Sequence, residues 1–177
     1  MEDNQNSIKH KFAPHFLATV IAVWALDVIT KIWAVRNLQE GVTESVIDSF
    51  FNYTLYYNTG GILGIFPDHP MIFQIMTGIA IILLIVFYIK TPSSNRIFHI
   101  TIALIAGGAL GNFTDRFFRK GVVDFLDVYI FSFRWPTFNV ADAFISVGAV
   151  LLVYVFYQME KEEKNRLAAE NETVNEE

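Results

Sequence analysis

The chain has 177 residues, 53% of them hydrophobic and only 18% charged, with a mean hydropathy of +0.38. A soluble domain carries more charge, and the net charge of −5 argues against a nucleic-acid partner. The absence of cysteine excludes disulfides, thiol catalysis and cysteine-based metal sites.

Four apolar stretches have the length of a membrane span: residues 16–35, 71–89, 97–113 and 138–157. About 20 apolar residues cross a bilayer as a helix. The alternative, four buried helices of a soluble bundle, requires polar faces, and the second stretch has no charged residue. The sequence therefore predicts an all-α membrane protein, a single domain of residues 1–177 with four transmembrane helices. The acidic segment 160–177 is interpreted as a solvated, frayed end. No small-residue cleavage site follows the first span, so it is not interpreted as a cleavable signal peptide.

Basic residues predict the orientation of these spans, because cytoplasmic loops are enriched in lysine and arginine. They precede the first span, lie between the second and third, and follow the fourth: Lys9, Lys11, Lys90, Arg96, Lys161, Lys164 and Arg166. We therefore expect both termini in the cytoplasm and both long loops outside. Arg116, Arg119, Lys120 and Arg134 break the rule in the second outer loop, which indicates a local role such as contact with anionic head groups or carboxylates.

The two outer loops carry patterns of their own. "SVIDSFFNYTLYYNTGG" is rich in β-branched and aromatic residues and ends in a turn signal, which predicts short strands. "FFRKGVVDFLDVYI" mixes basic and apolar residues, as a helix lying in the membrane interface does. Ala103, Gly107 and Gly111 repeat every four residues, which predicts close packing of the third span against another helix.

Carboxylates are rare and unevenly placed: between residues 71 and 159 the only acids are Asp115, Asp124, Asp127 and Asp142. Asp142 lies in an apolar span with no base near it in sequence, and Asp124 lies among valines and aromatics. Ionisable groups at such places usually mark function, so we expect catalysis from these two. Asp127 is interpreted as a solvated loop acid.

The other polar groups near the spans have structural interpretations. Asp27 and Lys31, four residues apart, are expected to neutralise each other. Asp115 is expected to pair locally with Arg116. Asn112 precedes Asp115 by three residues and Asn139 precedes Asp142 by three, so each amide is placed to orient its carboxylate or to hold a substrate carbonyl.

Two carboxylates without cysteine favour one kind of chemistry. The four histidines show no ligand spacing, and no serine-nucleophile or phosphate-loop motif is present, so no cofactor and no metal are expected. Two facing aspartates share a proton, so that one activates water while the other polarises the scissile carbonyl. A small transporter or proton pathway is the rival interpretation, but it predicts acids near the bilayer midplane rather than toward one surface.

The blocks "LDVITK", "NTGGILGIF", "GGALGNFTDR", "VVDF" and "FNVADAFISVG" resemble, in order and spacing, those of the bacterial lipoprotein signal peptidases, also called signal peptidase II. The resemblance covers residues 16–157. It implies a four-helix intramembrane aspartyl protease with a small extracytoplasmic β-cradle and a membrane-surface helix. Such an enzyme removes signal peptides from diacylglyceryl-modified prolipoproteins, cutting before the lipidated cysteine.

Further expectations follow from the resemblance. It implies a multi-pass protein of the bacterial cytoplasmic (inner) membrane, a monomer, with its active site near the outer leaflet and with sensitivity to globomycin-type peptide inhibitors. A catalytically silent lipoprotein-binding relative is the alternative. The family's catalytic pair falls on Asp124 and Asp142, and its supporting polar residues fall on Asp27, Lys31, Asn58, Gly60, Asn112, Asp115, Arg116 and Asn139. Ile62 and Leu63 depart from the family's usual Ala-Phe, which bears on substrate or inhibitor preference.

Overall fold

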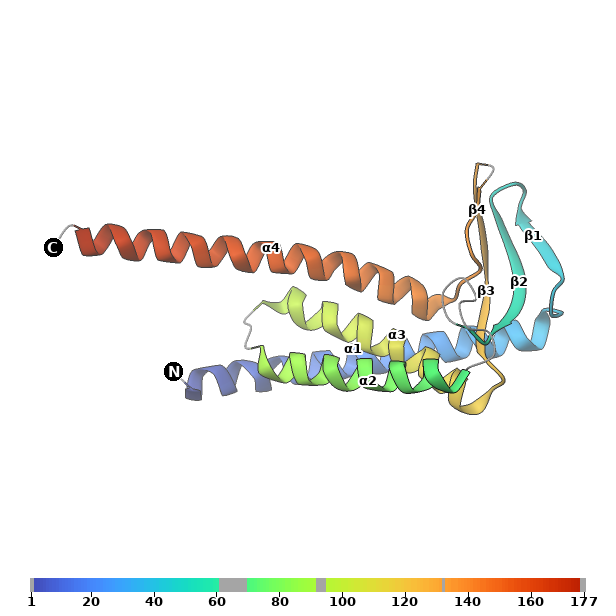
Figure 1. The fold of residues 1–177 in the computed structure, drawn as a ribbon, viewed down its shortest axis with the longest axis horizontal. Coiled ribbons are helices and arrows are strands. Elements are labelled where there is room, and N and C mark those ends of the chain that lie inside the picture. Colours follow the sequence, from blue (N-terminus) through green and yellow to red (C-terminus); the bar gives the residue numbers. More distant parts are fainter. Residues whose placement is uncertain (1, 61–69, 92–94, 132, 176–177) are drawn as a thin grey trace.

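A computed structural model describes residues 2–60, 70–91, 95–131 and 133–175. Its helices are α1 (Glu2–Asn37), α2 (Pro70–Lys90), α3 (Arg96–Phe118) and α4 (Val140–Asn175). Its strands are β1 (Thr43–Ile47), β2 (Phe51–Asn58), β3 (Val122–Ile130) and β4 (Phe133–Arg134), which form one antiparallel sheet in the order β1-β2-β3-β4. The sheet lies across one end of the helical bundle, and the start of α1 and the end of α4 point the other way (Figure 1).

All four helices contain a segment long and apolar enough to cross a membrane, as the sequence predicted. These segments are Pro14–Asn37, Met71–Lys90, Arg96–Phe118 and Val140–Ala168. Each extends past the predicted span by one or more residues at one end at least, because the helix runs on into its polar flanks. α2 leaves most of its large apolar side chains exposed, as a helix facing lipid does.

α3 is the central helix and packs against the other three. A Cβ atom at Gly107 would lie 2.7 Å from Val23 Cβ of α1, and one at Gly111 would overlap the carboxylate of Asp27 on the same helix. Gly108 faces α4 in the same way, since its Cβ would lie 2.6 Å from the carbonyl oxygen of Ala141. The predicted small-residue face is therefore confirmed, and it brings α1 and α4 into contact with the polar end of α3.

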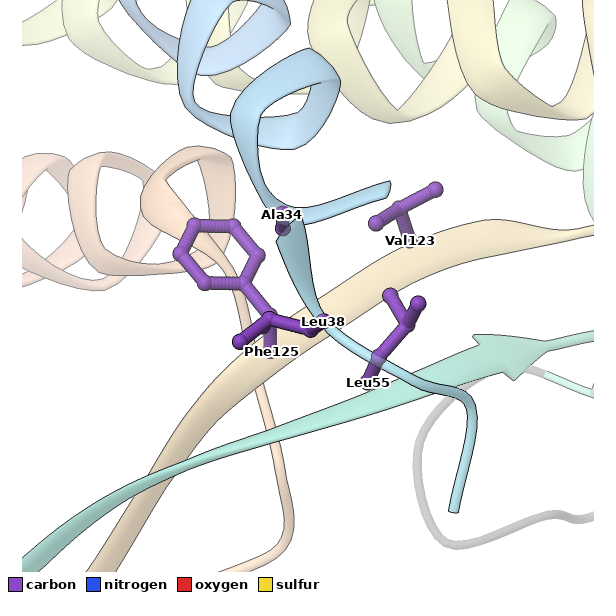
Figure 2. Close-up of a cluster of buried hydrophobic side chains, with 5 residues drawn as sticks. All are labelled: Ala34, Leu38, Leu55, Val123 and Phe125. Carbon is purple, nitrogen blue, oxygen red and sulfur yellow. The ribbon is translucent and has the colours of Figure 1, made fainter. Parts of the chain in front are cut away.

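A buried apolar cluster joins the sheet to the end of α1. Figure 2 shows Ala34 of α1, Leu38 just after the end of α1, Leu55 of β2, and Val123 and Phe125 of β3 packed together. Successive side chains of a strand point to opposite faces. Because Val123 and Phe125 face α1, the side chain between them, Asp124, is directed to the other side of β3.

The prediction of strands in "SVIDSFFNYTLYYNTGG" is confirmed by β1 and β2. The prediction of an interfacial helix in "FFRKGVVDFLDVYI" is wrong: residues 117 and 118 end α3, and residues 122–130 form β3. This segment carries the β-branched and aromatic residues that favour a strand, and β2 supplies the pairing partner that a sequence pattern alone does not reveal. The acidic segment was expected to be frayed, but α4 continues as a helix to Asn175, with residues 160–168 exposed.

Candidate active site

The polar residues predicted to support a site come together where the sheet meets the helices. The ends of α1 and α3 contact β3 at this end of the bundle, where α4 also begins (Figure 1). Residues far apart in the sequence therefore contact one another directly.

Asp124 lies on β3 with a side chain that is almost fully buried. One carboxylate oxygen accepts from Asn139 Nδ2 at 2.7 Å, and the other accepts from Asn58 Nδ2 at 3.0 Å. Burial, reinforced by the nearby charge of Asp142, raises the pKa of Asp124 to about 7, against the opposing effect of the two amides. A carboxyl group with this pKa exchanges its proton near neutral pH, as a general acid does.

Asp142 lies in the first turn of α4 and is half-buried. Its Oδ1 accepts from Asn112 Nδ2 at 2.8 Å, and its Oδ2 accepts from the main-chain N–H of Asn139 at 3.3 Å. The main-chain N–H of Asp142 donates back to Asn139 Oδ1 at 2.9 Å, which is the reciprocal pattern of a helix N-terminus. Both aspartates are thus held by Asn139, one through its side chain and one through its backbone.

A buried charge cluster lies beneath this pair. Lys31 Nζ lies 2.8 Å from Asp27 Oδ2, 3.0 Å from Asp115 Oδ2 and 2.9 Å from Asn112 Oδ1. Asp27 Oδ1 accepts from the main-chain N–H of Ala141 at 2.9 Å, which ties α1 to the start of α4. The predicted Asp27–Lys31 pair is confirmed. Lys31 also contacts Asp115 and Asn112 of α3, and spacing within one helix could not predict these two contacts.

Two local pairings predicted within α3 are wrong. Asp115 does not pair with Arg116; it pairs with Lys31 and with Arg119 Nε at 2.9 Å, and it accepts from the main-chain N–H of Val123 at 3.0 Å. Asn112 does not orient Asp115, because its amide is engaged by Lys31 and Asp142. In both cases packing against α3 brings a partner from another helix: Lys31 of α1 for Asp115, and Asp142 of α4 for Asn112. Arg119 is a local partner of Asp115, one helical turn further along the chain.

Asp127 was expected to be a solvated loop acid, and this expectation is wrong. Its side chain is fully buried and accepts from Arg134 Nε at 2.9 Å, Arg134 Nη2 at 2.8 Å and Thr54 Oγ1 at 2.8 Å. Thr54 was not among the residues predicted from the sequence to support the site. A strand prediction for residues 122–130 followed by a return strand would have placed Arg134 beside the carboxylate, because β3 and β4 form a hairpin.

An open cavity of about 260 Å³ is lined by Asn58, which donates to Asp124, and by Gln74, Arg116 and Lys120 among others. Arg116 is half-buried and has no hydrogen-bond or ion-pair partner among the residues that the structure describes, although it lies within electrostatic range of both aspartates. The main-chain N–H of Gly60 donates to Asn58 Oδ1 at 3.1 Å and so orients that amide. Ile62 and Leu63 lie outside the described residues.

Two carboxylates with a common hydrogen-bond partner and unequal burial match the arrangement that general acid–base catalysis requires. Within the described parts of the chain, no group of three histidine or acidic side chains is placed to hold a metal ion. The arrangement is therefore able to activate water with one carboxylate and to protonate a leaving group with the other.

The chain matches known proteins over most of its length. The family model described as signal peptidase (SPase) II matches residues 19–158. A lipoprotein signal peptidase of Listeria welshimeri serovar 6b is 41% identical over 143 residues, which is 80% of this chain and 93% of that protein.

The fold is also similar to those of solved bacterial membrane enzymes. A bacterial membrane enzyme determined at 2.3 Å has a TM-score of 0.77 and 33% identity, covering 83% of this chain and 90% of its own. A second bacterial membrane enzyme, determined at 1.9 Å, has a TM-score of 0.75 and 34% identity, covering 82% of this chain and 94% of its own. With the fold, the paired aspartates and the sequence match in agreement, the chain belongs to the signal peptidase II family.

Proposed function

We propose that this membrane peptidase removes the signal peptide from diacylglyceryl-modified prolipoproteins, cutting just before the lipidated cysteine, with Asp124 and Asp142 as its catalytic pair. Family membership supports the peptidase activity and the prolipoprotein substrate. The observation that carries the choice of residues is the engagement of both carboxylates by Asn139.

In the proposed reaction, one aspartate is ionised and takes a proton from water as the water oxygen attacks the scissile carbonyl carbon. The other is protonated and donates to the carbonyl oxygen, so that a tetrahedral diol forms. The carbon–nitrogen bond then breaks as a proton passes from one carboxyl of the pair to the leaving amine. One hydroxyl of the diol gives its proton to the other carboxylate and becomes the carbonyl of the new carboxyl group, which regenerates the pair. No metal is needed, because the proton on the second carboxyl performs the task of a Lewis acid.

Substrate contacts are proposed for the groups that border the cavity. The guanidinium of Arg116 makes no hydrogen bond or ion pair with a described residue. We propose that it donates to carbonyl groups of an extended peptide. Asn58, oriented by Gly60, lines the same cavity. Globomycin-type peptides would compete for this space, and a monomer is proposed as the working unit, since one chain contributes every group of the pair and its support.

The site is proposed to lie near the outer leaflet of the bacterial cytoplasmic membrane, with both termini in the cytoplasm and the sheet outside. The distribution of basic residues supports this orientation. A diacylglyceryl cysteine keeps its acyl chains in the leaflet and its backbone just above them. Carboxylates at the membrane–water boundary, reached by water from outside, fit a scissile bond held at that level.

The test of the catalytic pair is cleavage of a diacylglyceryl-prolipoprotein by the purified protein. Asp124→Asn and Asp142→Asn should each abolish cleavage, because general acid–base groups contribute about 10²–10⁴-fold. Asp48→Asn, the same change at an exposed turn residue, is the matched control and should cleave at the wild-type rate. Retention of more than about a tenth of the wild-type rate by either catalytic variant would refute the assignment.

Orientation is tested by labelling single cysteines in this cysteine-free chain with an impermeant maleimide on intact cells. Lys120 and Asn165 are exposed at opposite ends of the molecule. A cysteine replacing Lys120 should react from outside, and one replacing Asn165 should react only after permeabilisation. Labelling of the Asn165 position in intact cells would invert the topology and remove the site from the outer surface.

A further inference from the structure

The side-chain amides around the two aspartates have a direction that their partners determine. The oxygen and nitrogen of an asparagine are distinguished by what each contacts, because a group that only donates must face the oxygen. A lysine ammonium and a main-chain N–H have no lone pair to offer. Contacts to such groups therefore settle which way an amide points.

Each of the three asparagines at the site has its oxygen held by a donor of this kind. Lys31 Nζ donates to Asn112 Oδ1 at 2.9 Å, the main-chain N–H of Asp142 donates to Asn139 Oδ1 at 2.9 Å, and that of Gly60 donates to Asn58 Oδ1 at 3.1 Å. Every Nδ2 group is consequently turned toward a carboxylate. Asn139 and Asn58 donate to Asp124, and Asn112 donates to Asp142.

Asn112 differs from the other two because its anchor is a buried cation. Lys31 is fully buried, and Asn112 is buried as well. The chain of contacts Lys31–Asn112–Asp142 joins α1, α3 and α4 through two hydrogen bonds of 2.9 and 2.8 Å. A charge-assisted donor at one end of an amide polarises it and strengthens donation from the other end, and low dielectric enhances this effect.

We propose that Asn112 is a positioning residue of the peptidase, which passes the polarising effect of Lys31 on to the carboxylate of Asp142 and so fixes different roles for Asp142 and Asp124. The inference rests on the proposed catalytic pair and assigns a role to each member. Asp142 is then the base that takes the proton from water, and Asp124 is the acid that polarises the scissile carbonyl.

Two further features support this division of roles. Asp142 lies at the N-terminus of α4, where the helix dipole favours a negative charge, and it is more exposed than Asp124. Asp124 lies on a strand and is only 3% exposed. Two ionisable groups from other elements interact electrostatically with Asp142: Arg116 of α3 and Asp124 of β3. The other charged groups of the neighbouring cluster, Lys31, Asp27 and Asp115, contact one another, and Lys31 reaches Asp142 through Asn112.

The decisive variant is Asn112→Asp, which keeps the shape of the side chain. Its oxygen still accepts from Lys31 and from Asn139 Nδ2, but its other terminal atom no longer donates to Asp142. Loss of this hydrogen bond, together with repulsion between the new carboxylate and Asp142, should lower the cleavage rate at neutral pH about 10- to 100-fold. The pH optimum should move down by about one unit, because a protonated carboxyl restores the missing donor.

A second variant tests the lysine end without leaving a buried charge unpaired. Asp27→Asn combined with Lys31→Met removes one charge of each sign, and Asp115 keeps Arg119 as its partner. The rate should fall about tenfold, and the rise of rate with pH should move up by about one unit, since the amide that donates to Asp142 has lost the cation that polarises it. Lys164→Met, which removes an exposed lysine at the far end of α4, is the control and should keep the wild-type profile.

The outcomes separate the possibilities. If Asn112→Asp unfolds at the wild-type temperature or above and keeps the wild-type rate and pH optimum, Asn112 has only a structural role and the proposal is overturned. If that variant does not fold, a wild-type pH profile in the double variant overturns it instead. If Asp142→Asn itself remains active, the proposed catalytic pair fails first, whatever the behaviour of Asn112.

Discussion

Replacing Asp124 by asparagine should change the stability of the protein in opposite directions at low and high pH. Both oxygens of Asp124 accept from amides whose direction is determined, Asn139 on one side and Asn58 on the other. An asparagine at this position must turn its own NH₂ toward one of these NH₂ groups, and an amide nitrogen accepts no hydrogen bond. Burying this unmatched pair should cost about 1–3 kcal/mol.

A second effect, which depends on pH, lowers the stability of the wild-type protein but not that of the variant. The pKa of Asp124 is raised from 3.8 to about 7, first by burial and then by Asp142. Between these two values the folded state holds a proton that the unfolded state has released, so the wild-type protein loses stability as pH rises through this range. A shift of roughly three units corresponds to about 4 kcal/mol, which is fully lost above about pH 7. Asparagine has no such dependence.

The two effects predict a crossing. Asp124→Asn should be less stable than the wild type by about 1–3 kcal/mol near pH 4 and at least as stable near pH 8. Thermal unfolding in detergent at both pH values measures the difference, with Asp48→Asn as a control that should stay within about 0.5 kcal/mol of the wild type. A difference that is the same at both pH values, or a variant more stable than the wild type at pH 4, would refute the reasoning.

Three further outcomes are expected. Gly107→Ala should lower stability by about 1–3 kcal/mol, since its Cβ would lie 2.7 Å from Val23 Cβ, whereas Gly78→Ala, with its closest neighbour at 3.5 Å, should be tolerated in the same thermal assay. Arg134→Gln should lower the free energy of unfolding by about 1–3 kcal/mol, because the buried carboxylate of Asp127 loses two charged hydrogen bonds. The loss is not larger because Arg134 is half-exposed and its charge is partly solvated. An unchanged unfolding temperature would contradict this. EDTA should leave cleavage intact, and a full loss reversed by zinc would require another mechanism.

The sequence by itself determined the features that a bilayer requires of any chain that crosses it, above all the number and length of the apolar helices. Helix length and apolar composition predicted all four span-length helices, because a bilayer leaves backbone polar groups no partner outside a helix. The small-residue spacing at Gly107 and Gly111 predicted close packing of α3, and the alternation of β-branched and aromatic residues predicted β1 and β2. The family motifs pointed to the polar residues that the structure brings together.

Only the tertiary structure decided which of these polar groups contact one another. Asp115 exchanged its sequence neighbour Arg116 for Lys31 and Arg119, Asn112 turned to Asp142, and Asp127 became buried against Arg134. The segment that was expected to be an interfacial helix became β3 for the same reason. Spacing along the chain describes neighbours on one helix or strand, and it explains the contact of Asp115 with Arg119 one turn away. A buried charge also needs the partners that packing brings within about 3 Å, and Lys31, Asp142 and Arg134 come from other elements than Asp115, Asn112 and Asp127 do.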